Sequence, residues 1–506
     1  MIRNLKPIPM KKIICTILSL IIMLSFAYAQ KESIIIAATA RLTGKITSPN
    51  NQSNAISITI TVPHLISGEY VKHQTFAKPS GEFSFEVDVE TDTSLIGFYT
   101  SINPEKSLLI KLASGATTNV DISYNSEDGI KNIETEPAYP QNDMTRALEV
   151  VGEMIEFRPD RAPTPLYDKR VDFFLDYINT AISERLNIVD NDPLISKGLK
   201  EHLAKDFRLW MYVGHVFHYE SEMIRNFRNT NNDQSKKLDV QKIDKSYFRF
   251  LRDFNLNDQQ YLYCFSFMEF QKEILQNENL GLPVIGDTDI PSWLASVKTI
   301  LSDLVGFDDG KYYDILVANA YGRQLNEEVK QLSEKQKRNI SDYWKNGEIA
   351  KILFRKNEEV VELGRLKSPV VVSDVSLVSD DKTIETILSK YKGKVVFIDL
   401  WATWCSPCLD AMKDFRNAKN ELRDENVAFI YLTNGSSPRK LWEEKIKGIG
   451  DEHYYLSDSQ WSYVMDKFSF EAIPSYLLFD KEGRLTTKFT GFPGSKEVKD
   501  MIKANL

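Results

Sequence analysis

Two cysteines separated by two residues are the part of this sequence best suited to chemistry. They are Cys405 and Cys408, in the segment Trp-Ala-Thr-Trp-Cys-Ser-Pro-Cys. An apolar run predicts a buried strand over 395–401, and the pattern that follows predicts a helix from about Cys408 to Leu422. Unpaired backbone N–H groups and the helix dipole stabilise a thiolate at such a helix start. The spacing therefore predicts a reversible dithiol–disulfide pair.

The two sulfurs are expected to have different roles. A thiolate is the attacking species in disulfide exchange, so Cys405 should form the mixed disulfide with a client protein. Cys408, one turn further and more buried, should then resolve it. Pro407 stiffens the turn and removes one N–H donor, whereas Ser406 keeps its own. This chemistry requires no cofactor besides the redox-active disulfide of Cys405 and Cys408.

A carboxyl group lies in the same apolar run. Asp399 stands six residues before Cys405. Burial disfavours the charged form of a carboxyl group, so we expect the pKa of Asp399 to be raised. Such a group suits proton transfer to or from Cys408. A buried carboxyl that is satisfied by hydrogen bonds and has no catalytic role is the alternative.

Zinc binding and peroxide reduction are competing interpretations of the motif. A zinc site needs a second pair of ligands, but His453 is the one histidine after residue 369, and no further cysteine follows Cys408. Peroxiredoxins have the pattern Pro-x-x-x-Thr-x-x-Cys. When its cysteine is aligned with Cys405, Ile398 stands where the pattern has proline and Ala402 where it has threonine. We therefore expect no bound metal and no peroxidase activity.

The motif and its surroundings resemble the thioredoxin superfamily, and more narrowly the exported TlpA/ResA-like thiol–disulfide oxidoreductases. The resemblance covers about 140 of 506 residues and includes an extra insert, expected to be helical, between about Gly435 and Ser469. It implies a thioredoxin-like fold over 369–506 and a proton-transfer role for Asp399. The family places a cis proline beside the active site, and Ile473 and Pro474 match that position.

The resemblance also suggests how clients bind. Main-chain groups of Ile473, next to Pro474, would hydrogen-bond an extended client segment. Trp404, with Ser406 and Pro407, would line the rim of the site. Relatives of the reductive branch imply reduction of protein disulfides and an electron donor in the membrane.

Two positions depart from the family pattern. Many relatives have a proline five residues after the second cysteine, and some exported ones have an acid three residues after it. Lys413 and Ala411 occupy those positions here.

The amino terminus has the three parts of a secretory signal peptide over 1–29. A basic stretch is followed by the apolar run 13–26 and by the small-residue site Ala27-Tyr28-Ala29. The apolar run is shorter than the roughly 20 residues that a membrane-spanning helix needs. These features predict export to the periplasm or cell envelope by a cleavable signal, with a retained anchor as the alternative.

Two further segments separate this signal from the cysteines. Alternation of apolar and polar residues over 56–62 and 83–89 predicts an antiparallel β-sandwich within 30–135. Helical periodicity predicts an all-α domain over 140–363, including a helix that begins at Asp289-Ile290-Pro291. The chain is therefore expected to be multidomain.

Two features of the predicted helical domain are candidate chemical sites. His215, His218 and Glu222 share one helix face that could bind zinc, but aromatic neighbours and the lack of a third strong ligand favour ordinary packing. Cys264, within an aromatic run, is expected to be a small core residue.

The composition restricts the classes of molecule that the protein is expected to bind. With 63 basic and 71 acidic residues the formal charge is -8, so no positive field favours nucleic acid. Four cysteines in 506 residues are too few for a disulfide-stapled scaffold. Protein thiols and disulfides are the expected partners, and the sequence indicates no oligomeric state. The alternative is an envelope binding or docking protein whose thioredoxin-like domain has little catalytic activity.

Overall fold

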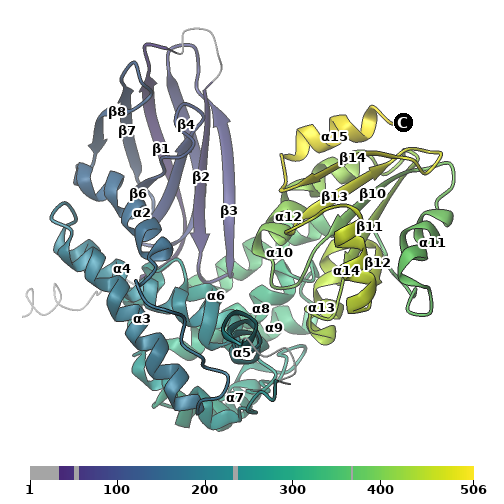
Figure 1. Ribbon diagram of the computed structural model, residues 1–506. Helices are drawn as coiled ribbons and strands as arrows, with labels where there is room; N and C mark the ends of the chain where they lie inside the picture. The colour runs from purple at the N-terminus through teal and green to yellow at the C-terminus, as the bar shows by residue number, and fades with distance from the viewer. Residues whose placement is uncertain (1–33, 51–55, 232–237, 366–367) are drawn as a thin grey trace, which may run out of the picture.

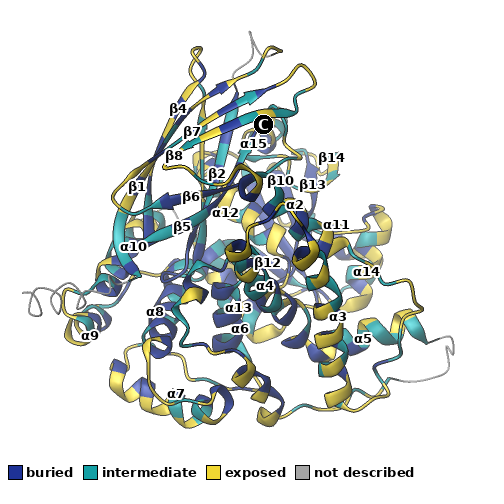
Figure 2. Cartoon of the chain, turned by 90° about the vertical axis from the view of Figure 1, so that its left-hand side faces the viewer, coloured by how far each residue is buried: buried dark blue, intermediate teal, exposed yellow. Residues whose placement is uncertain are grey.

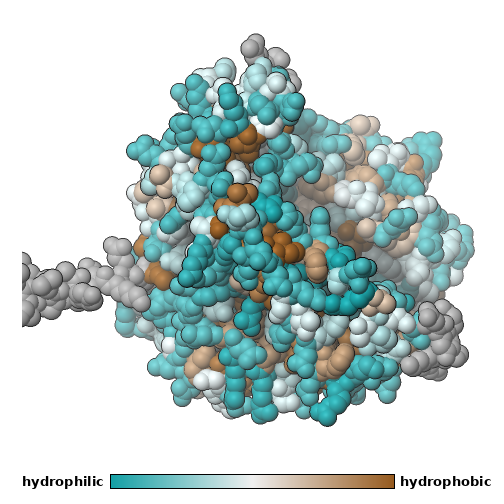
Figure 3. All heavy atoms as spheres, turned by 60° about the vertical axis from the view of Figure 1, so that its left-hand side comes forward, coloured by the Kyte–Doolittle hydropathy of each residue, from teal (hydrophilic) through white to brown (hydrophobic). Residues whose placement is uncertain are grey.

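The computed structural model describes residues 34–50, 56–231, 238–365 and 368–506. Figure 1 shows three parts in chain order: a pair of β-sheets, a group of helices and an α/β part that ends at the C-terminus. Buried residues lie along the inward sides of these elements (Figure 2). The face drawn in Figure 3 is largely hydrophilic, with smaller apolar areas between the polar groups. The predicted signal over 1–29 lies outside the described residues.

In the part of 34–136 that the structure describes, two four-stranded sheets have the orders β4-β1-β7-β8 and β3-β2-β5-β6. The strands are β1 (Ile35–Thr47), β2 (Ser57–His64), β3 (Glu69–Phe76), β4 (Glu82–Thr91), β5 (Thr93–Thr100), β6 (Leu108–Ala113), β7 (Thr117–Tyr124) and β8 (Ile130–Glu136). Both sheets contribute to one core, in which Leu42, Ile60 and Phe98 are fully buried. This shared core accounts for the alternation of apolar and polar residues along the strands.

One strand pair departs from the expected antiparallel arrangement. β1 and β7 run parallel, from Arg41 opposite Thr117 to Thr47 opposite Ser123. Alternation within a strand reports which side chains face the core, but it does not report the direction of a partner that lies more than 70 residues away. The sequence could therefore locate these strands without giving their pairing.

The middle of the chain folds into helices. They are α2 (Gln141–Glu156), α3 (Val171–Asn191), α4 (Lys197–Met211), α5 (Tyr219–Thr230), α6 (Phe267–Gln276), α7 (Ile290–Val305), α8 (Lys311–Asn326), α9 (Glu334–Trp344) and α10 (Glu348–Arg365). The cap at Asp289 is confirmed, because its side chain accepts the Ser292 N–H and a proline follows in the first turn. Among the described residues, no helix combines the length and apolar character needed to cross a membrane.

The α/β part has a mixed sheet in the order β14-β13-β10-β11-β12-β9. Its strands are β9 (Val370–Ser373), β10 (Val395–Leu400), β11 (Val427–Thr433), β12 (Asp451–Tyr455), β13 (Ser475–Phe479) and β14 (Leu485–Thr490). Its helices are α11 (Thr383–Ser389), α12 (Ser406–Glu421), α13 (Arg439–Ile449), α14 (Asp458–Lys467) and α15 (Ser495–Lys503). Separate apolar cores cover the two faces of the sheet.

The insert between about Gly435 and Ser469 was expected to be helical, and that expectation was incomplete. It contains α13 and α14, but it also contains β12, which pairs in parallel with β11 and β9. β12 is short, and the charged residues Asp451 and Glu452 begin it, so no apolar alternation marks it in the sequence.

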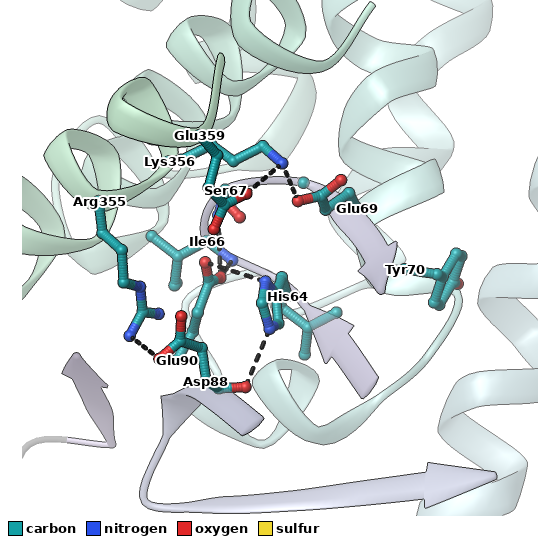
Figure 4. Close-up of polar contacts among 12 residues, drawn as sticks. His64, Ile66, Ser67, Glu69, Tyr70, Asp88, Glu90, Arg355, Lys356 and Glu359 are labelled. Atoms are coloured by element: carbon teal, nitrogen blue, oxygen red, sulfur yellow. Dashed lines mark hydrogen bonds and ion pairs between the residues drawn. The ribbon is translucent and has the colours of Figure 1, made fainter. Parts of the chain in front are cut away.

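Ion pairs join the α/β part to the rest of the chain. Glu69, at the start of β3, is buried and accepts hydrogen bonds from Lys356 of α10 (Figure 4) and from Lys413 of α12 at 2.7 Å. Burial would raise the pKa of Glu69, but Lys413 and Lys356 outweigh it and lower the pKa to about 2. A charged Glu69 therefore links all three parts of the chain.

A second contact lies at the end of α8. Glu327 forms an ion pair with Lys445 of α13 at 3.6 Å, and Arg323 of α8 pairs with Glu444 at 3.2 Å. Gly448 packs so closely on the Glu327 backbone that a Cβ atom there would overlap the carbonyl oxygen. The close approach of α13 to the helical part therefore depends on a residue without a side chain.

We expect Glu69→Gln to weaken the docking of the α/β part, because it removes the anionic partner of Lys413 and one of the two anionic partners of Lys356. The folded pKa of about 2 lies below the ordinary 4.5, so the carboxylate stabilises fully above pH 4.5 and loses this effect as pH falls toward 2. Scanning calorimetry should show melting several degrees below the parent at about pH 7, and a smaller difference below about pH 4.5.

The matched control for this change is Glu82→Gln, which alters an exposed glutamate at the start of β4. It should melt with the parent at every pH. Equal melting of Glu69→Gln and the parent at neutral pH would contradict the assigned role of Glu69.

Candidate active site

The site forms where β10 ends and α12 begins. All six residues of β10 are buried, and the strand lies between β11 and β13, so its end is fixed on both sides. Cys405 is the N-cap of α12, and the Cys408 N–H donates to its Sγ at 3.2 Å. Pro407 occupies the first turn of the helix, where a missing N–H costs nothing. The strand-to-helix junction expected from the sequence is present.

Cys405 and Cys408 are joined by a disulfide, with Cα atoms 5.3 Å apart. Cys405 keeps 4% of its surface exposed, and Cys408 is completely buried. Trp404, at 60% exposure, and the exposed Ser406 and Pro407 flank Cys405 in the sequence. An attacking thiolate can therefore reach the disulfide only from the Cys405 side, across this rim.

The loop after β11 supports the rim. The Trp404 Nε1–H donates to Ser436 Oγ at 3.2 Å, and that hydroxyl donates to Asn434 at 2.8 Å. The Thr403 N–H donates to Ser437 Oγ at 3.0 Å. These polar residues were not among the site residues predicted from the sequence. Their signal was a run of small polar residues directly after an apolar strand, at the same sheet edge as the cysteines.

Asp399 is the buried acid of the site. It is 3% exposed and faces Tyr431 and Tyr476 across the two neighbouring strands. Its Oδ1 has no hydrogen-bond partner among the described residues. Burial raises the pKa of Asp399 well above its ordinary value, and the nearby Lys419 offsets only part of this rise. Burial therefore favours the protonated form of Asp399, which makes the group suited to exchanging a proton with a neighbouring thiol.

Ile473 and Pro474 lie beside the end of β10. The peptide between them is cis, and Ser475, which follows, pairs with Leu400 at the end of β10. The main-chain N–H and C=O of Ile473 make no hydrogen bond with the residues that the structure describes. These groups are available to an extended segment bound next to the cysteines.

The three histidines considered as possible zinc ligands have other partners in the structure. His215 pairs with Glu222 at 3.2 Å, and His218 lies 3.7 Å from Glu273. His453 is buried, stacks on Tyr431 and contacts the Gly450 carbonyl at 2.9 Å. Within the described ranges, no group of three or more histidine, cysteine, aspartate or glutamate side chains could hold a metal ion. Cys264 is a free thiol in the helical core.

Comparison with known proteins agrees with this geometry. Residues 369–504 match the Redoxin family. The thiol-disulfide oxidoreductase ResA of Bacillus thuringiensis is 24% identical over 146 residues, which are 29% of this chain and 80% of the relative. ResA of Bacillus subtilis is 27% identical over 113 residues, or 22% of this chain and 61% of the relative.

Solved structures match the same part of the chain. A putative thiol-disulfide oxidoreductase from Bacteroides vulgatus is 26% identical and has a TM-score of 0.21, covering 24% of this chain and 83% of that one. The exposed lipoprotein thioredoxin Etrx1 of Streptococcus pneumoniae is 25% identical and has a TM-score of 0.21. The match covers 23% of this chain and 89% of that one. The matches cover the C-terminal part of the chain.

We expect Asp399→Asn to slow disulfide exchange by about 100-fold, because positioned proton transfer contributes that much or more. It should also raise stability at neutral pH. The unfolded carboxyl ionises near its ordinary pKa of 3.8 and the folded one far above it, so the cost of burying Asp399 grows as pH rises from 3.8.

Turnover and melting measured between about pH 4 and pH 8 would check both effects. The stability gain should be largest at the alkaline end, and the exposed Asp424→Asn variant should match the parent throughout. Full activity of Asp399→Asn would remove Asp399 from the reaction.

Proposed function

We propose that this chain, whose residues 369–504 form a thioredoxin-like domain of the Redoxin family, exchanges disulfides with client proteins in the cell envelope, in the reducing direction. The observation that carries the proposal is the Cys405–Cys408 disulfide at the start of α12, in which Cys405 keeps 4% of its surface exposed and Cys408 is completely buried. The ResA relatives, named as thiol-disulfide oxidoreductases, support the same chemistry.

The proposed reaction starts from the reduced pair. The Cys405 thiolate attacks a client disulfide, forms a mixed disulfide and releases one client thiolate. The Cys408 N–H and the start of α12 stabilise the Cys405 thiolate before attack. Cys408 then attacks Cys405, which releases the second client thiolate and leaves the enzyme disulfide. Two electrons pass to the client, and an electron donor in the membrane restores the dithiol.

Proton movement is assigned to Asp399. Cys408 is fully buried and must lose its proton before it can attack Cys405. The buried carboxyl of Asp399 has an unpaired oxygen that can accept a proton and return it when the pair is reduced again. In the reverse direction, the same group protonates the Cys408 thiolate as it leaves.

Clients are proposed to bind across the rim. Trp404 offers an exposed aromatic face, and the exposed Ser406 and Pro407 border the sulfur. The free main-chain groups of Ile473, next to Pro474, would pair with the client backbone. Because backbone pairing is independent of sequence, this arrangement accepts extended segments of many clients.

The signal-like segment over 1–29 supports export, and an envelope location would keep the pair among oxidised proteins. A membrane donor must then supply electrons, because the reductants of the cytosol do not reach that compartment. The reduction potential of Cys405 and Cys408, measured against glutathione, tests the reducing direction.

An insulin-reduction assay on residues 30–506 tests the activity. Cys405→Ser should abolish thiol-dependent turnover, and Cys408→Ser should accumulate a mixed disulfide at Cys405 that gel electrophoresis without reductant detects. Cys264→Ser, which changes a buried thiol in the helical core, should retain full activity. No turnover by the parent would favour a binding or docking role for the chain.

Trp404→Ala tests the rim. Loss of an exposed aromatic contact should raise the KM for a protein client about tenfold, because aromatic anchors contribute heavily to interfaces. Reduction of a small aromatic disulfide, which does not span the rim, should change little. An unchanged KM for the protein client would show that Trp404 lies outside the client-binding surface.

A further inference from the structure

A cavity of about 190 Å³ lies where the three parts of the chain meet. Its walls come from the start of β3, from α6, α8 and α10 of the helical part, and from α12 and α13 of the α/β part. We call it the junction cavity. A cavity of about 150 Å³ holds a benzene ring, so the space suffices for a small organic molecule. Binding sites for small molecules are common at domain interfaces.

The lining of the junction cavity has more basic than acidic side chains. The basic residues are Lys272, Lys356, Lys413, Arg416, Lys419 and Lys445, and the acidic ones are Glu69, Glu269, Glu327 and Asp410. Glu69 is shared by two lysines, and Glu327 is shared by Lys272 and Lys445. Each of the five lysines has at least one carboxylate partner, whereas Arg416 has none among the described residues, so its charge is the one that a bound anion would neutralise.

Two of the cations retain free hydrogen-bond donors. Arg416 of α12 makes no hydrogen bond or ion pair with the residues that the structure describes, although burial lowers the pKa of its guanidinium. Lys445 of α13 is 5% exposed and makes no hydrogen bond within the described ranges. Its ion pair with Glu327 is long, at 3.6 Å, and burial lowers the pKa of Lys445 as well.

A buried charge without close partners is costly, so these two groups gain from any ligand that offers oxygen atoms. A guanidinium group presents a planar fork of N–H donors that matches the two oxygens of a carboxylate or phosphate. A lysine adds a point charge from a second direction. The pair therefore selects small oxyanions over neutral or cationic molecules.

We propose that the junction cavity is a binding site for a small anion with carboxylate or phosphate oxygens, held by Arg416 from α12 and Lys445 from α13. Residues of β3 and of α6, α8 and α10 also line the cavity, so a bound anion would lie where the three parts of the chain meet. Binding at this point would stabilise the docked arrangement by mass action.

Titration calorimetry and thermal melting of residues 30–506 test the proposal with two probes, inorganic phosphate and succinate. Sodium chloride at equal ionic strength is the reference, because general screening affects every surface charge. At least one probe should bind with saturation and raise the melting temperature. Binding of phosphate but not succinate assigns phosphate oxygens as the preferred ligand, and the reverse result assigns a dicarboxylate.

Arg416→Gln is the principal variant, because Arg416 has no partner among the described residues and its loss breaks no ion pair. It should weaken binding about tenfold or more, as expected for a lost charge-assisted hydrogen bond. Lys445→Gln should weaken binding similarly. The exposed Arg423→Gln and Lys447→Gln, an arginine just after α12 and a lysine on α13, are matched controls that should bind like the parent.

Two outcomes would overturn the proposal. One is the absence of saturable binding of either probe beyond the sodium chloride reference. The other is equal affinity of the parent and Arg416→Gln, with circular dichroism showing both folded. Either outcome leaves the thiol chemistry of Cys405 and Cys408 untouched, since insulin reduction is measured separately.

Discussion

The central constraint of this structure is the fixed meeting of β10 with α12. A fully buried strand, paired on both sides, delivers the chain to a helix whose first cap is a cysteine. The Cys408 N–H then points at Cys405 Sγ, and the same short turn brings the second sulfur within bonding distance of the first. Stabilisation of the Cys405 thiolate and burial of Cys408 both follow from this junction.

Buried charge organises the assembly around that junction. Glu69 and Glu327 are both held ionised, with pKa values lowered to about 2 although burial acts in the opposite direction. Each is surrounded by basic groups from more than one part of the chain, and lysines of α12 or α13 are among them. The position of the redox domain therefore depends on electrostatic contacts that form only when it is docked on the other parts of the chain.

The sequence predicted what depends on local pattern. The cysteine spacing, the apolar strand before it and the cap at Asp289 are short-range features, and the structure has each of them. It did not predict what depends on distant partners. Glu69 and Lys413 are 344 residues apart, and the parallel pairing of β1 with β7 joins strands separated by five others. Neither the ion pair nor the strand pairing leaves a periodic pattern in the sequence, because the residues around one partner do not depend on which distant residue it contacts.

Helix α12 belongs to both the redox site and the junction cavity. Its first turn carries Cys405 and Cys408, and two turns further Lys413 and Arg416 face the helical part and the sheets. A helix transmits displacement along its axis because its backbone hydrogen bonds resist bending. The β-sheets and helices before the redox domain thus contact the same helix that carries both sulfurs, through the charges that dock them against it.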